Sequence, residues 1–98
     1  MKQVIDPEIA YFSLKGKNFV NLAGFIFELD ELNKPIIYCD EWRSGLKFYC
    51  PFCKTIHKHG IGNGWRVPHC TNWDSPFWKL GQYCLILKEE PKDVEYEN

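Results

Sequence analysis

Cys50 and Cys53 are the residues of this sequence best suited to chemistry, because they enclose only Pro51 and Phe52 between them. Such a Cys-x-x-Cys knuckle places two thiolates on one side of the backbone. There both sulfurs can reach a Zn²⁺ ion at about 2.3 Å, which makes half of a tetrahedral site. Cys70 and all three histidines of the chain follow shortly after the knuckle, so the segment predicts a complete zinc site.

The histidine of this predicted site depends on how the chain runs after the knuckle. A hairpin that pairs residues 55–59 with residues 65–69 would return His69 to the knuckle. The same hairpin would carry His57 about 13 Å away from it. If residues 54–57 curl into a turn instead, His57 comes back beside the second cysteine. We predict the ligand set Cys50, Cys53, His57 and Cys70, with His69 and His59 as alternatives for the histidine.

A redox role is a further interpretation of the knuckle. Cys-Pro-Phe-Cys is close to the active-site motif of glutaredoxin-like enzymes, in which a helix N-terminus lowers the pKa of a thiol. Residues 54–64 contain β-branched side chains and three glycines, so the required helix is not expected after Cys53. A thiol–disulfide redox protein that uses Cys50 and Cys53 is therefore the least favoured alternative.

The acidic residues of the chain bear on whether the zinc site is catalytic. A hydrolytic zinc site keeps one coordination position open and uses a nearby general base, usually a carboxylate. No Asp or Glu stands between Cys50 and Cys70. Thiolate-rich ligation without an acid is typical of a closed structural site, whose metal-binding free energy is on the order of 10 kcal/mol. We expect the protein not to be an enzyme and the zinc to be part of its folding.

Alternating apolar residues predict a mainly β fold, a small antiparallel sheet that carries the knuckle and its hairpin. The predicted strands are residues 18–29, with a bend at Gly24, then 36–42, 46–50 and 82–88. The first two of them should pair as a hairpin. A helical turn at residues 77–80 and a short helix at residues 7–14, capped by Asp6, are the helices expected. Cys39 and Cys84 lie inside apolar strands and are interpreted as core residues.

Composition indicates one small domain. The chain has 98 residues, 45% of them hydrophobic, which is enough apolar mass for a core, and we expect a single domain over residues 1–98. Within it we expect a zinc-ribbon-like element at residues 46–71 and a flexible acidic tail at residues 89–98. No apolar run approaches the roughly 20 residues that span a bilayer, so we expect a cytoplasmic protein without membrane contact.

The cysteine and histidine motifs together resemble those of a family of short bacterial and phage proteins that have no assigned activity. The residues that carry the resemblance are Cys50-Pro51-x-Cys53, His57-x-His59-Gly60, Arg66-x-x-His69-Cys70, Ser75-Pro76-Phe77 and Gly81-x-Tyr83. They cover about the C-terminal half of the chain. Phe77 stands where the family pattern has tyrosine, and Gln82 separates a Gly-Tyr pair. The resemblance implies a zinc-ribbon-like site and a bacterial or phage source, and it implies nothing about a substrate.

A zinc module without catalytic residues is expected to act by binding a macromolecular partner. We expect a protein partner, docked on an aromatic surface, as an inhibitor or adaptor encoded by a phage would be. The aromatic residues proposed for this surface are Trp65, Trp73, Phe77 and Trp78. The sequence leaves the oligomeric state open.

Nucleic-acid binding is the alternative, because basic side chains can meet phosphates while aromatic side chains stack on bases. The residues considered are Lys47, Lys54, Lys58, Arg66 and Lys79, set among Phe48, Phe52, Trp65 and Trp73. Of these, Lys54, Lys58, Trp65 and Arg66 are the candidate contacts for a partner or a phosphate. The formal net charge of -1 supplies no long-range attraction to nucleic acid, so the contact would have to be a local patch.

Overall fold

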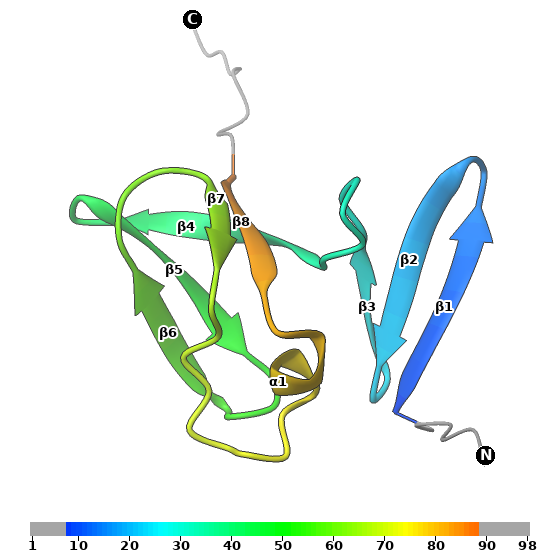
Figure 1. The fold of residues 1–98 in the computed structure, drawn as a ribbon. Coiled ribbons are helices and arrows are strands. Elements are labelled where there is room, and N and C mark those ends of the chain that lie inside the picture. The colour runs from blue at the N-terminus through cyan, green and yellow to red at the C-terminus, as the bar shows by residue number, and fades with distance from the viewer. Residues whose placement is uncertain (1–7, 89–98) are drawn as a thin grey trace, which may run out of the picture.

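The computed structural model describes residues 8–88, which form two β-sheets and one short helix (Figure 1). The first sheet has the order β1-β2-β3, with β1 at Ile9–Leu14, β2 at Lys17–Leu22 and β3 at Phe25–Glu28. The second has the order β6-β5-β4-β8-β7. Its strands are β4 at Ile36–Trp42, β5 at Gly45–Cys50, β6 at Thr55–His59, β7 at Gly64–Arg66 and β8 at Tyr83–Leu87, and helix α1 spans Pro76–Leu80. The predicted mainly β class is confirmed.

Several elements match the sequence-based predictions and others lie outside the described residues. The strands predicted at residues 36–42, 46–50 and 82–88 are β4, β5 and β8, and the predicted helical turn is α1. The predicted flexible tail at residues 89–98 is not among the described residues. No helix in the described range is long and apolar enough to cross a membrane.

The strand predicted over residues 18–29 is wrong as a single element, because it is two strands joined by a tight turn. Ala23 and Gly24 have φ angles of 51° and 97°, so both residues adopt the left-handed conformation of a two-residue hairpin turn. The side chain of Asn21 accepts a hydrogen bond from the backbone N–H of Gly24 at 2.8 Å. The chain therefore reverses at the position where a bend was expected.

The helix predicted over residues 7–14 is also wrong for the described part of that segment. Ile9–Leu14 is strand β1, which pairs with β2 from Ile9 opposite Leu22 to Leu14 opposite Lys17. The ring of Phe12 stacks on that of Phe19 with centroids 5.3 Å apart. Cross-strand aromatic packing of this kind stabilises a sheet and here outweighs the local helix-start signal.

The predicted hairpin between the first strands and β4 does not form. Leu29 and Pro35 make an isolated bridge, and the intervening turn is held by the Asp30 carboxylate, which accepts hydrogen bonds from the backbone N–H groups of Leu32 and Lys34. Strand β4 instead pairs in parallel with β8 and antiparallel with β5. The two predicted partners thus belong to different sheets.

The predicted pairing of residues 55–59 with residues 65–69 is wrong as well. Strand β6 pairs with β5, with Thr55 opposite Cys50 and His59 opposite Leu46. Strand β7 pairs with β8 at the other edge of the five-stranded sheet. The physical reason is the sharp reversal at the knuckle, where Lys54 has a φ of 56° and its N–H donates to the carbonyl of Cys50 at 2.8 Å.

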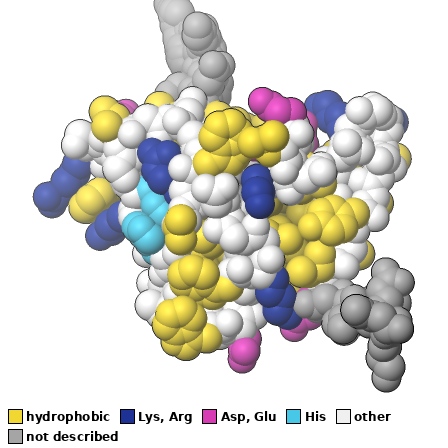
Figure 2. Space-filling view, viewed as in Figure 1, with side chains coloured by type: hydrophobic (Ala, Val, Ile, Leu, Met, Phe, Trp, Pro, Cys, Tyr) yellow, Lys and Arg dark blue, Asp and Glu magenta, His cyan; other side chains and the backbone are white. Residues whose placement is uncertain are grey.

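The core lies where the inner face of the five-stranded sheet meets helix α1 and the three-stranded sheet. Phe77 of α1 is fully buried, and its ring lies 5.5 Å from that of Phe27 in β3 and 5.0 Å from that of Tyr83 in β8. Cys39 is buried in this core, as predicted, while Cys84 is only partly buried. Hydrophobic side chains also reach the surface in patches (Figure 2).

Candidate metal centre

The knuckle begins where strand β5 ends. Side chains alternate between the two faces of β5, so that Leu46, Phe48 and Cys50 point toward the core. The thiol of Cys50, the last residue of the strand, is therefore buried. The chain then turns through Pro51 and Phe52 and closes with the hydrogen bond from Lys54 to the Cys50 carbonyl. This turn brings the Cys53 thiol back toward the first one.

His57 and Cys70 reach the knuckle from two other segments. His57 lies on the inner face of β6 opposite Phe48, and its side chain is buried. Cys70 lies in the segment between β7 and α1, with its sulfur 3.8 Å from that of Cys50. Three separate stretches of chain therefore converge on one buried point.

The four side chains form a compact group of ligand atoms. One sulfur or nitrogen atom from each of Cys50, Cys53, His57 and Cys70 lies within 4.8 Å of all the others. In a tetrahedral site with bonds of about 2.3 Å, the sulfur atoms would stand about 3.8 Å apart. The distance between the sulfurs of Cys50 and Cys70 matches this value. The group could therefore hold a metal ion.

An orphaned nitrogen atom supports the same conclusion. The Nε2 atom of His57 is buried and has no hydrogen-bond partner among the described residues. A buried polar atom without a partner costs about 1–3 kcal/mol. A metal ion bound by the Nε2 lone pair would remove this cost, so the imidazole fits the role of a ligand.

Burial affects the ionisation of each side chain in the group. Burial raises the pKa of Cys50, and it raises the pKa of Cys70 to about 12. Burial opposes ionisation of Cys53 too, but hydrogen bonds from Asn72 and Cys70 hold its pKa below the ordinary value. Burial lowers the pKa of His57 and so favours its neutral imidazole. A bound metal ion would displace the thiol protons and balance the thiolate charge.

Donors around the sulfurs were not anticipated from the sequence. The backbone N–H of Asn72 donates to the Cys53 sulfur at 3.5 Å, and the hydroxyl of Ser75 donates to the Cys70 sulfur at 3.1 Å. The Ser75 hydroxyl also accepts a hydrogen bond from the N–H of Phe77 and so caps helix α1. A serine directly before a proline and an apolar turn is an N-cap signal, and this signal could have identified Ser75.

The alternative histidines lie outside the group of four. His59 is buried, with its Nε2 atom 2.7 Å from the hydroxyl of Tyr83. His69 is exposed, with its Nδ1 atom 3.1 Å from the carbonyl oxygen of Lys58, and histidine surface is visible in Figure 2. The two rings stack with centroids 3.9 Å apart. The argument that favoured His69 rested on the strand pairing that does not form, whereas the early reversal at the knuckle brings His57 into the group.

The candidate partner contacts are spread over the molecule. Lys54 is exposed at the knuckle, and Lys58 lies over the ring of Trp42 at 4.2 Å. Trp65 and Arg66 stand on β7, at the opposite edge of the sheet from β6. The Trp65 indole donates to Asp30, and the Arg66 guanidinium donates to the carbonyl of Gly62 at 2.7 Å. The structure does not bring these four predicted contacts together.

The four aromatic residues predicted to contact a protein partner differ in exposure. Phe77 is fully buried in the core and is not available to a partner. Trp73 is 78% exposed and stacks on Trp78, with ring centroids 5.4 Å apart. Trp65 stands on β7 and is also exposed. Because Phe77 lies in the core, it cannot be part of the docking surface that the sequence suggested.

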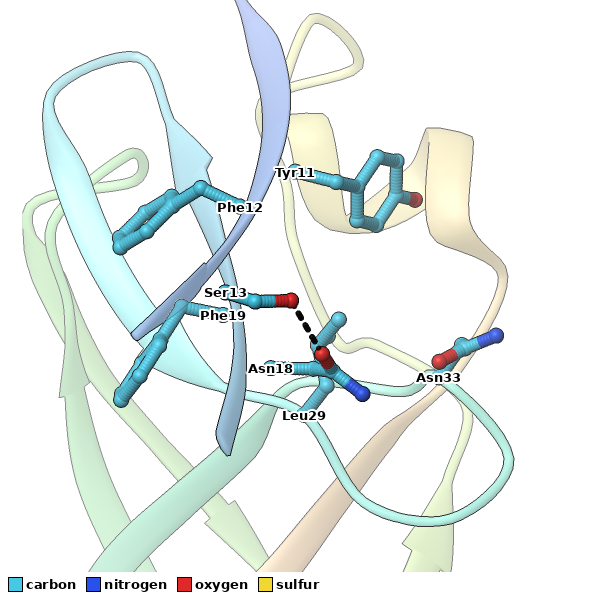
Figure 3. A pocket seen from close by; sticks show the side chains of 7 residues that line it. All are labelled: Tyr11, Phe12, Ser13, Asn18, Phe19, Leu29 and Asn33. Carbon is cyan, nitrogen blue, oxygen red and sulfur yellow. Dashed lines mark hydrogen bonds between the residues drawn. The ribbon is translucent and has the colours of Figure 1, made fainter. Parts of the chain in front are cut away.

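A pocket of about 370 Å³ opens at the hairpin of β1 and β2 (Figure 3). Its lining residues are Tyr11, Phe12, Ser13, Asn18, Phe19, Leu29 and Asn33. Ser13 donates to the side chain of Asn18 at 2.6 Å, and the lining contains no histidine, cysteine or carboxylate. The cysteine and histidine group is therefore the stronger candidate for a functional site.

Comparisons with known proteins identify no relative. No family model matches the chain, and neither the curated proteins nor the solved structures give a significant match. The resemblance to short bacterial and phage proteins therefore stays a prediction. The cluster of Cys50, Cys53, His57 and Cys70 agrees with the metal-binding part of that pattern.

Proposed function

We propose that the protein is a zinc-stabilised binding module in which Cys50, Cys53, His57 and Cys70 hold one structural Zn²⁺ ion. The observation that carries the proposal is the convergence of these four ligand atoms within 4.8 Å of one another. Three thiolates and one imidazole in a tetrahedral arrangement are a donor set that zinc prefers. The unpartnered Nε2 atom of His57 adds independent support.

The donor set favours a structural ion over a catalytic one. Four protein ligands fill a tetrahedral shell and leave no position for a substrate or a water molecule. The group itself contains no carboxylate that could act as a general base. We therefore propose that the protein acts by contact with a macromolecular partner, and that the zinc ion maintains the surface that makes this contact.

The three segments that would share the ion explain what it would stabilise. Cys50 ends β5, His57 lies in β6, and Cys70 precedes helix α1 and its buried Phe77. A structural zinc ion contributes on the order of 10 kcal/mol, which is comparable to the whole stability of a small domain. Loss of the ion would therefore unfold this part of the molecule.

The fold after the knuckle does not support the redox alternative. Residues Thr55–His59 form strand β6, so the helix that follows the second cysteine in glutaredoxin-like enzymes is absent after Cys53. A redox protein would also keep its fold after removal of metal. The structural zinc function and the redox function therefore predict different fold stability after removal of metal.

Removal of metal by a chelator tests the proposed function. We expect the strand signal in circular dichroism and the cooperative melting to disappear with the chelator and to return with added Zn²⁺. The chelator must be tested in parallel on a zinc-free β protein as a control. An unchanged melting temperature in protein shown to be free of metal would contradict the proposal.

A further inference from the structure

The outer face of the five-stranded sheet is open to solvent. Strand alternation directs one set of side chains into the core and the other set outward. The side chains of the outer face that concern us are Tyr38, Trp42, Lys47, Tyr49, Ile56 and Lys58, from β4, β5 and β6. Among the described elements, helix α1 and the core residues lie on the opposite side.

Two tyrosines on this outer face expose much of their rings. Tyr38 is 52% exposed and Tyr49 is 60% exposed. Tyr49 stands directly opposite Ile56, which is itself half exposed, so the ring has an apolar neighbour on its own face. Exposed aromatic rings on a sheet are suited to stacking on flat, unpaired groups such as nucleic-acid bases.

The cations of the outer face lie close to one another. Lys47 and Lys58 are direct cross-strand partners, an arrangement of like charges that is unfavourable in a sheet. Lys58 and Arg43 both lie over the ring of Trp42, at 4.2 Å and 4.8 Å from its centroid. A bound polyanion would relieve the repulsion among these cations. In Figure 2, basic and hydrophobic side chains stand side by side at the left of the view, where Figure 1 places the end of β4.

A carboxylate on the strand beside Lys47 already forms an ion pair. Asp40 is the cross-strand partner of Lys47 on β4, but its side chain forms an ion pair with Lys88 at 3.2 Å. The local charge of the outer face is therefore positive, although the whole chain has a formal net charge of -1. Charge complementarity favours an anionic ligand here.

An apolar groove continues the outer face toward the three-stranded sheet. It has a volume of about 520 Å³ and is lined by Phe25, Ile26 and Phe27 of β3 together with Tyr49, Pro51 and Lys54. Tyr49 belongs to both the groove and the outer face. A base next to those stacked on the sheet could bind in this groove, with its phosphate beside the Lys54 ammonium group.

We propose that the outer face and the groove bind single-stranded nucleic acid, with bases stacked on Tyr49 and Tyr38 and phosphates beside Lys47, Lys58 and Lys54. The inference rests on the proposed function, because Cys50 ends the strand that carries Lys47 and Tyr49. Unpaired bases are required, since a duplex hides their faces. An acidic protein segment could meet the lysines but would not need the exposed rings, so the aromatic residues favour nucleic acid.

Fluorescence anisotropy with the zinc-loaded full chain tests this inference. The probes are a labelled oligothymidylate of about 20 nucleotides, the duplex of the same length, and labelled poly-glutamate, each titrated from low salt upward. We expect the single strand to bind more tightly than the duplex or poly-glutamate. Its affinity should fall with added salt, because phosphate contacts release counterions.

Two sets of variants separate the charges from the rings. Lys47→Gln/Lys58→Gln should reduce the slope of log K against log salt by about 1.4, whereas Lys15→Gln/Lys17→Gln, which removes the same charge from the distant β1–β2 hairpin, should leave it unchanged. Tyr49→Ala should weaken binding at least about fivefold, and Tyr49→Phe should retain the affinity.

Zinc content and melting are measured on the same samples, so that the two proposals can fail separately. Zinc-loaded, folded protein that binds no single strand at low salt would overturn the inference and leave the zinc function intact. Poly-glutamate bound as tightly as the oligonucleotide, with no effect of Tyr49→Ala, would overturn it in favour of a protein partner. Binding by folded protein that contains no metal would overturn the zinc function and leave the nucleic-acid surface standing.

Discussion

The hydroxyl of Ser75 donates a hydrogen bond to the sulfur of Cys70 at 3.1 Å, and both side chains are buried. The same oxygen accepts the N–H of Phe77 at 3.3 Å, at the start of helix α1. One side chain thus connects the proposed metal centre to the helix that carries the central core residue. We expect metal affinity and helix stability to depend on it together.

Replacement of Ser75 tests this connection. Ser75→Ala removes the helix cap and the donor to the sulfur, so we expect a loss of about 1–2 kcal/mol in the free energy of unfolding and about tenfold weaker zinc binding. Urea unfolding and chelator competition measure the two effects. Ser44→Ala, in the exposed turn before β5, is the control and should change neither. A Ser75→Ala protein with unchanged zinc affinity would show that the hydroxyl serves the helix alone.

Replacement of individual histidines identifies the nitrogen ligand. His57→Gln should weaken zinc binding more than about 100-fold, because loss of a ligand costs more than loss of its hydrogen-bonded neighbour. His69→Gln should retain the metal, since His69 is exposed and lies outside the group. Chelator competition with both variants gives the comparison. The reverse ranking would assign the site to His69.

Two glycines test the pairing of β5 with β6. A Cβ atom at Gly45 would overlap the carbonyl oxygen of His59, whereas one at Gly60 would meet no atom within 4 Å. We expect Gly45→Ala to lower the free energy of unfolding by about 1–3 kcal/mol. Gly60→Ala should be neutral or stabilising by less than about 1 kcal/mol. Equal effects in urea unfolding would argue against the described register.

The buried thiol of Cys39 predicts a loss of stability in alkali. Burial raises its pKa from 9.0 to about 11, so the folded state favours the neutral thiol more than the unfolded state does. The stabilisation that the neutral Cys39 thiol gives the folded state is fully present below pH 9 and is lost as the pH rises toward 11. Over that interval wild-type stability should fall by up to about 3 kcal/mol more than that of Cys39→Val. Parallel stability curves of the two proteins above pH 9 would refute the prediction.

The knuckle was predictable from the sequence because its geometry is local. Cys50 and Cys53 need only a tight turn to meet, and Cys70 follows closely in the chain. The histidine was harder to predict, since a strand period of two places His57 and His59 on one face but does not say which strand lies beside them. The strand that lies beside β6 is decided by the reversal at Lys54, which has a positive φ although it is not glycine. No turn motif in the sequence predicts this conformation.

The N-terminal sheet shows the same limit more strongly. Ala23 and Lys15 adopt left-handed conformations at the two turns of this sheet. Alanine and lysine are not residue types that predict a turn of this kind. The parallel pairing of β4 with β8 joins residues nearly fifty positions apart, from Ile36 to Cys84. Pairings of this kind are set by the packing of the whole core, which local periodicity does not contain.

The most direct test of the central claim is the metal content of the purified protein together with X-ray absorption at the zinc edge. We predict about one zinc ion per chain, with three sulfur atoms at about 2.3 Å and one nitrogen atom at about 2.0–2.1 Å. Well-folded protein without metal, or zinc in a shell of nitrogen and oxygen atoms only, would contradict the claim that Cys50, Cys53, His57 and Cys70 form a structural zinc site.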